Sequence, residues 1–388
     1  MEPSFPLPCL VIDHDGAGGE QCTTVLDISK AEYQYRTCND IDVLRRNNRR
    51  WATPDGWVLS WDPSTLSTFL WSPQTSEKIV LPPLTQEITR YSACSLSDKP
   101  TRNAGFTVVV VEPEDTVIWY CRVGGTTAAG SAGWVRYEYD LGSVMVLGLG
   151  PIKGRITRLT ACRGRLYFVQ SIDELGVLEF APEPVLTCLS VPAVKRPAAM
   201  TSMAVSCVEL DGELYLVSAF LHSALGVDTS VLGCGVYRMD FAARRWRRVR
   251  SIGDRAFLMC RSHFGGWCAA TGSGLRPNCV YWMAPCYNLN LLHVFDISGS
   301  TYEVHDPFIG FLGVSGLCRR FGRSAPSLKA ELRIPAAGSM KLLGWLLLVL
   351  LLLRLEGRRS VGYAAFPNNL VAPDKGVKWD PTFVPLVV

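Results

Sequence analysis

Apolar, strand-like segments return along the chain at a nearly constant spacing, each introduced by a polar turn that contains glycine. The clearest pair is residues 162–169 and 210–217, where a charged-Gly-charged turn precedes Leu-Tyr and a short apolar run. The turn glycines, Gly164 and Gly212, lie 48 residues apart. A repeat of roughly 45–50 residues built from short strands is typical of a β-propeller, in which each four-stranded blade buries its faces against neighbouring blades.

The same pattern can be followed through most of the chain. Strands of two early units are expected at residues 51–60, 68–75, 77–84, 105–111, 117–123 and 134–139, and three later units span 152–192, 200–250 and 255–308. No helical apolar period of useful length occurs before residue 309. Strands expected at 7–12 and 23–28 could supply a sixth unit and close the ring against material from the other end. The sequence therefore predicts an all-β fold, a β-propeller of five to six four-stranded blades.

Composition divides the chain into a propeller body and a basic tail. Of 388 residues, 48% are apolar and 19% charged, which is ample material for a packed core. Residues 1–308 carry 28 Lys/Arg against 31 Asp/Glu, whereas residues 309–388 carry 11 against 4. We expect residues 1–308 to form one domain that folds without the tail, because each blade needs only its neighbours.

Cysteine usage and the N-terminus bear on the compartment. The fourteen cysteines are scattered, form no CxxC pair, and many lie in apolar runs, where a free thiol behaves as a small buried hydrophobe. Residues 1–10 lack the basic and apolar regions of a signal peptide. These features predict reduced thiols and a cytoplasmic or nuclear protein.

The tail contains a short apolar segment at residues 342–353, which includes Leu342, Trp345 and Leu353. Twelve helical residues span about 18 Å, while a bilayer core is about 30 Å thick. Three interpretations stay open: a membrane anchor that would make the protein membrane-associated, a helix packed on the propeller or on a partner, and an extension that reflects an altered gene model.

Several motifs follow the repeat in a fixed order. They are Gly-Trp-Val-Leu at 56–59, Trp-Ser-Pro-Gln-Thr at 71–75, Leu-Pro-Pro-Leu at 81–84, Gly-Asp-Arg-Ala-Phe at 253–257, Pro-Asn-Cys-Val-Tyr at 277–281 and Val-Phe-Asp-Ile at 294–297. This combination resembles the plant KIB-type β-propeller family, once called domain of unknown function 295. The resemblance covers about residues 7–308. Residues 379–385 also resemble an ending of this family.

The resemblance implies a role in protein recognition. Members of the family commonly carry an F-box before the propeller and act as substrate-recognition subunits of ubiquitin ligases. This chain departs from that pattern, because it begins almost at the first propeller strand and leaves no room for a helical F-box of roughly 40 residues. We therefore expect no docking to Skp1-type adaptors by this chain alone.

Residue types that carry chemistry are sparse. The five histidines show no HxH or HExxH spacing, and no glycine-rich loop precedes a helix as phosphate binding requires. We identify no catalytic residue, metal site or cofactor. The basic segment 244–250, interleaved with Trp246, could contact nucleic acid, but the net negative charge of the body favours a solvated outer strand.

Two groups of residues remain as candidates for contact or for structure. Arg46, Arg49, Arg50 and Trp51 are expected on a connection between blades, where propellers often place partner-binding residues; a solvated loop is the alternative. By contrast, Gly253, Asp254 and Asn278 are expected to be structural turn residues, since Gly supplies φ > 0 and Asp and Asn cap their own turns. Loss of the Asp254 or Asn278 side chain should cost about 1–2 kcal/mol.

The leading hypothesis is a monomeric, non-enzymatic propeller that binds a protein partner through its loop-bearing face. The rivals are a membrane-tethered version of the same protein and a propeller that binds a small molecule or sugar, or acts as an enzyme, at the central channel. The last would need acidic or histidine side chains converging there from several blades.

Overall fold

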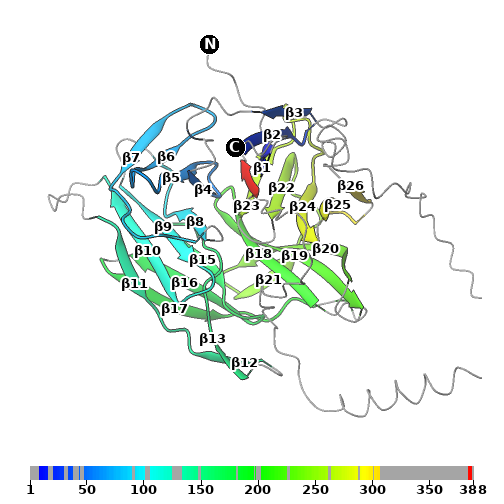
Figure 1. The fold of residues 1–388 in the computed structure, drawn as a ribbon. Helices are drawn as coiled ribbons and strands as arrows, with labels where there is room; N and C mark the ends of the chain where they lie inside the picture. The colour runs from blue at the N-terminus through cyan, green and yellow to red at the C-terminus, as the bar shows by residue number, and fades with distance from the viewer. Residues whose placement is uncertain are drawn as a thin grey trace, which may run out of the picture.

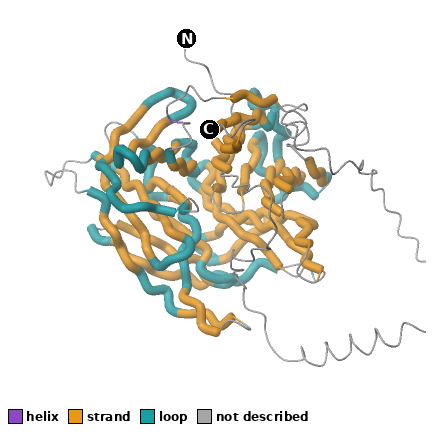
Figure 2. The backbone as a smooth tube through the Cα atoms, viewed as in Figure 1, coloured by secondary structure: helices purple, strands orange, loops and turns teal. Residues whose placement is uncertain are grey.

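The structure, a computed structural model, shows a closed ring of β-sheets (Figure 1). It describes residues 8–15, 21–29, 34–37, 43, 48–89, 92–100, 105–124, 133–146, 150–180, 182–195, 197, 202–224, 228–260, 264–286, 289–299, 301–305 and 383–386. In these residues strands and turns account for the fold, as Figure 2 shows, and no α-helix occurs.

Six sheets of the described chain form the blades. Blade 1 consists of β4 (Arg49–Ala52), β5 (Val58–Trp61), β6 (Thr68–Trp71) and β7 (Lys78–Leu81). Blade 2 consists of β8 (Ala93–Leu96), β9 (Phe106–Glu112), β10 (Val117–Val123) and β11 (Val135–Glu138). Blade 3 consists of β14 (Thr160–Cys162), β15 (Arg165–Val169), β16 (Glu174–Phe180) and β17 (Pro184–Ser190). A hairpin of β12 (Ser143–Val146) and β13 (Gly150–Lys153) stands between blades 2 and 3 in the sequence.

The remaining blades are longer or less regular. Blade 4 consists of β18 (Ser202–Leu210), β19 (Glu213–Ala224), β20 (Asp228–Asp240) and β21 (Arg245–Arg248). Blade 5 has the order β23 (Phe264–Ala269), β22 (Arg255–Cys260), β24 (Cys279–Cys286), β25 (Leu289–Asp296) and β26 (Tyr302–His305). Blade 6 has the order β27 (Phe383–Leu386), β1 (Cys9–Asp15), β2 (Gln21–Asp27) and β3 (Gln34–Thr37).

Neighbouring strands pair antiparallel in the described blades except in blade 5. There β22 and β24 run parallel, with Ala256 opposite Cys279 and Leu258 opposite Tyr281. The hairpin partner of β22 is β23, which takes the channel-side edge of the sheet. The inner strands β27, β4, β8, β14, β18 and β23 follow one another around the channel.

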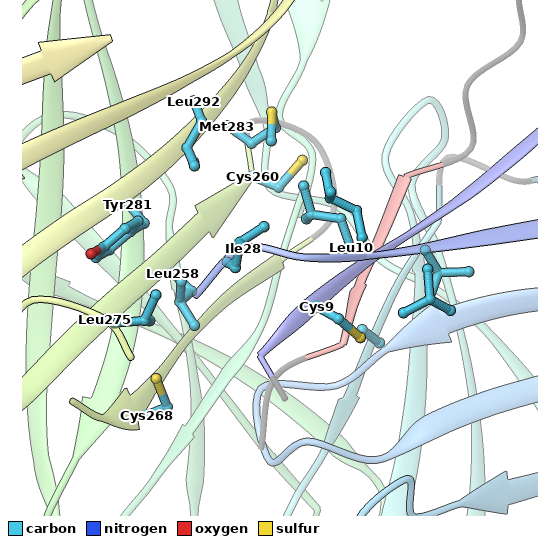
Figure 3. Close-up of a cluster of buried hydrophobic side chains, with 14 of the residues drawn as sticks. Cys9, Leu10, Ile28, Leu258, Cys260, Cys268, Leu275, Tyr281, Met283 and Leu292 are labelled. Carbon is cyan, nitrogen blue, oxygen red and sulfur yellow. The ribbon is translucent and has the colours of Figure 1, made fainter. Parts of the chain in front are cut away.

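The core consists of apolar layers between adjacent blades. Trp51, Leu59 and Val108 belong to the layer between blades 1 and 2, and corresponding layers separate blades 2 and 3, 3 and 4, and 4 and 5. One further cluster joins blade 6 to both of its neighbours, with Leu10 and Leu258 among its members (Figure 3). Burial therefore continues around the whole ring, which is what a propeller needs because no blade has a core of its own.

Hydroxyl groups link the inner strands to one another. Ser95 Oγ donates to the Leu159 carbonyl (2.6 Å) and Thr160 Oγ1 to the Cys207 carbonyl (3.0 Å). Arg158 Nη1 reaches across the channel side to Ser206 Oγ (3.0 Å) and to the carbonyl of Cys260 (3.2 Å). These bonds connect blades 2, 3, 4 and 5 to one another on the channel side.

The all-β propeller predicted from the repeat is confirmed, and the N-terminal strands supply a sixth blade as expected. The segment 309–388, expected to lie outside the propeller, contributes β27 to blade 6. The apolar stretch with Leu342, Trp345 and Leu353 lies outside the described residues. In the part of the chain that is described, no helix has the length and apolarity needed to span a bilayer.

Candidate functional site

A groove opens between blades 2 and 3 on the face that carries the β8–β9 and β14–β15 turns. We call it the inter-blade groove; its volume is about 360 Å³. Side chains that line it include Ser97, Phe106, Arg122, Leu166, Glu179 and Phe180. The lining mixes apolar side chains with charged groups at the rim, which is typical of surfaces that bind other molecules.

Next to the groove, an aromatic pair lies in the apolar layer between blades 2 and 3. Tyr120 and Arg122 are two residues apart and point to the same side of the sheet. The ring of Tyr120 is buried and lies 5.0 Å from the ring of Phe180, which comes from the end of β16 in the next blade. Blades 2 and 3 therefore share one aromatic pair, and Arg122 projects from it into solvent.

The charges of the groove are unevenly paired. Glu179 accepts a hydrogen bond from Arg165 Nε at 2.9 Å, so its charge is offset within blade 3. The guanidinium carbon of Arg122 lies 5.9 Å from the centre of the Tyr120 ring, and no carboxylate of the described residues forms an ion pair with it. Burial, reinforced by Glu183, raises the pKa of Tyr120. Arg122 is thus an exposed cation held over an aromatic ring and open to an anionic partner.

A second electrostatic feature lies on the same face, in the β4–β5 turn of blade 1. Desolvation raises the pKa of Asp55 to about 6; Lys99 opposes the shift, and the nearby carboxylates Glu209 and Asp98 add to it. These groups come from the edges of three different blades. They make the channel mouth acidic on this face and leave one carboxyl that titrates near neutral pH.

The residues expected to contact a partner lie mostly inside the propeller. Arg49, Arg50 and Trp51 belong to β4, the inner strand of blade 1, and not to a connection between blades. Trp51 is 3% exposed and Arg50 4%, because their strand is covered on both faces by neighbouring blades. Arg46 lies outside the described residues.

Arg49 performs a structural task at the start of β4. Its guanidinium pairs with Glu87, donates to the Ile88 carbonyl, and lies 5.2 Å from the centre of the Trp61 ring. The side chain thereby connects blade 1 to the segment that leads into blade 2. The expectation of a contact surface at these positions is corrected accordingly: the described members of the group pack and bond within the ring.

The three turn residues stand where two chain segments meet at one end of blade 5. Asn278 has φ 57°, accepts a hydrogen bond from Ile252 N at its side-chain oxygen (3.0 Å), and donates from its amide to the Arg250 carbonyl and Asp296 Oδ1. Asp254 Oδ1 accepts from Thr271 N (3.1 Å). Gly253 has φ 65°. These bonds run to groups of blade 5 and of the segment that leads into it.

The dense basic segment forms an outer strand. β21 contributes arginines that face the adjacent strand β20, and Arg247 Nε donates to Asp240 Oδ2 at 2.6 Å. Such cross-strand pairs are ordinary on a solvated sheet edge. Among the described residues no three His, Cys, Asp or Glu side chains form a group that could hold a metal ion.

Sequence reasoning missed the inter-blade groove for an identifiable reason. Its aromatic pair, Tyr120 and Phe180, is separated by 60 residues and comes together only when two consecutive blades pack. One signal was present in the sequence: the apolar strand residues Trp-Tyr-Cys at 119–121 are followed directly by an arginine. That signal marks the strand end but does not identify the partner ring.

Some solved structures have a similar course of the chain. They include BBS1N in complex with ARL6DN (10% identity, TM-score 0.30, covering 73% of this chain and 74% of that one) and a streptogramin B lyase (12%, 0.30, 78% and 85%). A putative 6-phosphogluconolactonase from Bacteroides uniformis is also similar (13%, 0.31, 76% and 80%). At these identities and TM-scores the similarity says nothing about function. No match was found among curated proteins.

The family model gives a direct assignment. It is described as the KIB1-4 β-propeller, and the matched segment runs from β2 through β26 and contains the turn residues of blade 5. Since the match covers residues 26–306, well over half of the sequence, the chain belongs to the KIB1-4 β-propeller family.

Proposed function

We propose that this protein is a non-enzymatic interaction module whose inter-blade groove receives a segment of a protein partner. The observation that carries the proposal is Arg122, an exposed cation over the Tyr120 ring without an ion-pair partner among the described carboxylates. Arginine and aromatic side chains at the centre of a depression are the residue types that contribute most to protein binding.

The chemistry of the groove narrows the partner segment. Arg122 favours a carboxylate, and the apolar walls formed by Leu166, Leu178 and Phe180 favour an apolar side chain next to it. Glu179 is already offset by Arg165 and adds little repulsion. The segment that fits is therefore an exposed loop or tail with an acidic residue beside an apolar one.

Acidic groups gather at the mouth of the channel, where Asp55, Asp98 and Glu209 lie near one another. Along the channel itself, the described inner strands contain a single carboxylate, Glu209, and no histidine. Catalysis at a propeller channel needs acid, base or metal-ligating groups that converge from several blades. The inner strands instead carry hydroxyl groups that bond to the carbonyls of their neighbours.

The proposal is tested by affinity purification followed by mass spectrometry with the wild-type chain, Arg122→Glu, and the matched control Arg238→Glu. Arg238 is also an exposed strand arginine but lies on β20, away from the groove. We expect Arg122→Glu to recover at least tenfold less of the specific partners than the wild-type chain does, and the control to recover as much. Both variants should have the melting temperature of the wild-type chain. Equal recovery by both variants would show that the groove is not the binding site.

A further inference from the structure

The ring is completed by a strand that is remote in sequence from every other strand. β27 pairs antiparallel with β1, with Cys9 opposite Leu386, Leu10 opposite Pro385, and Val11 opposite Val384. It forms the channel-side edge of blade 6, so β1 is its partner in the sheet. Figure 3 shows β27 in red beside the strand that carries Cys9 and Leu10.

The strand that receives β27 is held by the blades on both sides of it. Cys9, Leu10 and Val11 of β1 are buried, with exposures of 0%, 4% and 1%. Their cluster includes Leu258 of blade 5 and Val58 of blade 1, so β1 is held by both neighbouring blades. Departure of β27 would therefore expose the edge of a strand that stays fixed by its side chains, which is the arrangement of an acceptor for an added strand.

Pro385 defines which side of β27 faces β1. Proline has no N–H, and in sheets it is confined to positions whose N–H would not enter the ladder. Residues opposite each other in an antiparallel pair alternate between hydrogen-bonded and non-bonded pairs. We infer from the missing N–H of Pro385 that Pro385 and Leu10 are a non-bonded pair. In this register Phe383 and Ile12 are then a non-bonded pair as well, and Val384 and Leu386 direct their N–H groups toward β1.

We propose that the channel-side edge of β1 is a strand-acceptor site whose ligand is an extended peptide, the segment 383–386 of this chain. The segment binds through main-chain hydrogen bonds to β1 residues 9–12. It can leave and rebind while the rest of the ring stays folded, because side chains of β1 and β2 anchor blade 6 to both of its neighbouring blades.

The test uses the full chain with a specific protease site introduced between residues 309 and 378. After folding and cleavage, we expect the C-terminal fragment to remain bound to the body in gel filtration. A synthetic peptide of residues 379–388 should displace it and, when labelled, bind the cleaved protein far more readily than the uncleaved one. The body should keep its β-sheet circular dichroism throughout.

Two backbone-edited peptides provide the matched controls. N-methylation of residue 384 removes an N–H directed at β1 and should weaken binding at least tenfold, whereas N-methylation of residue 383 should change it less than threefold. Three results would each overturn the proposal: separation of the fragment without peptide binding, equal binding by the two edited peptides, or unfolding of the body on cleavage. The last counts because an acceptor site must stay folded when its ligand leaves.

Discussion

Asn278 is the side chain that joins the end of β25 to the segment between β21 and β22. Its side chain reaches Ile252, Arg250 and Asp296, and its backbone stands at positive φ. We expect Asn278→Ala to lower the free energy of unfolding by about 2–3 kcal/mol, because it removes these bonds and puts alanine, which tolerates the left-handed region less well than asparagine, at positive φ. Asn278→Gly, which tolerates the backbone, should cost less. Equal losses in denaturant titrations would contradict this separation.

Asp254 makes a smaller contribution in the same turn. Its carboxylate accepts from Thr271 N, and Asp254→Ala should cost about 1 kcal/mol, the size of a lost cap. Partner binding by the folded fraction should be unchanged, as measured by titration against any partner recovered with the wild-type chain. A variant with the wild-type melting temperature but without binding would instead identify Asp254 as a contact residue.

Asp55 imposes a pH dependence of defined sign. Its pKa is raised from 3.8 to about 6 on folding, so the folded state holds the proton more tightly, and stability falls as pH rises from about 4 to about 6. Well above pH 6 the full free-energy cost of burying the ionised Asp55 carboxylate is present. We expect Asp55→Asn to raise the unfolding free energy by about 1–3 kcal/mol at pH 7.5, with the gain vanishing toward pH 4.

Melting curves of this variant across pH 4–8 measure the effect. Glu114→Gln, at an exposed turn position between β9 and β10, is the control for loss of one negative charge. A gain for Asp55→Asn that is independent of pH would show that burial of the carboxylate is not its cause.

Strand pairing in blade 3 depends on a glycine opposite an aromatic ring. Gly176 of β16 stands across from Phe168 of β15, and a Cβ at this glycine would overlap the ring. Phe168 is 2% exposed and has no room to move. Gly176→Ala should therefore lower stability by about 2–3 kcal/mol in chemical denaturation, through overpacking. Gly133→Ala, with open space around the added carbon, should have almost no effect.

Local patterns predicted most strands but not the strand order of blade 5. The sequence indicated the period of the repeat, the turn glycines and the position of Asn278, because turn chemistry and alternation are local properties. The parallel pairing of β22 with β24 was not, since a periodic reading assumes that consecutive strands are neighbours. The predicted position of Trp51 was wrong for a similar reason. A basic run next to an aromatic residue is compatible with a loop and with a buried inner strand, and local sequence does not distinguish the two.

The ring as a whole should survive loss of the C-terminal segment, at reduced stability. A chain of residues 1–308 keeps the apolar layers between blades and loses the pairing of β27 with β1. We expect it to show β-sheet circular dichroism and to melt cooperatively at a lower temperature than the full chain. An unfolded truncated chain would contradict the prediction, and so would a melting temperature equal to that of the full chain.

The pairing of the first strand with the last also has a consequence for synthesis on the ribosome. β1 is synthesised more than 360 residues before its partner β27. At elongation rates of about 5–20 residues per second, roughly 20–75 s separate the two events. Throughout that interval an apolar strand edge, Cys9–Leu10–Val11, has no partner from its own chain and is exposed to pairing with other nascent chains. Folding of this propeller in the cell therefore depends on protection of β1 until β27 has been made.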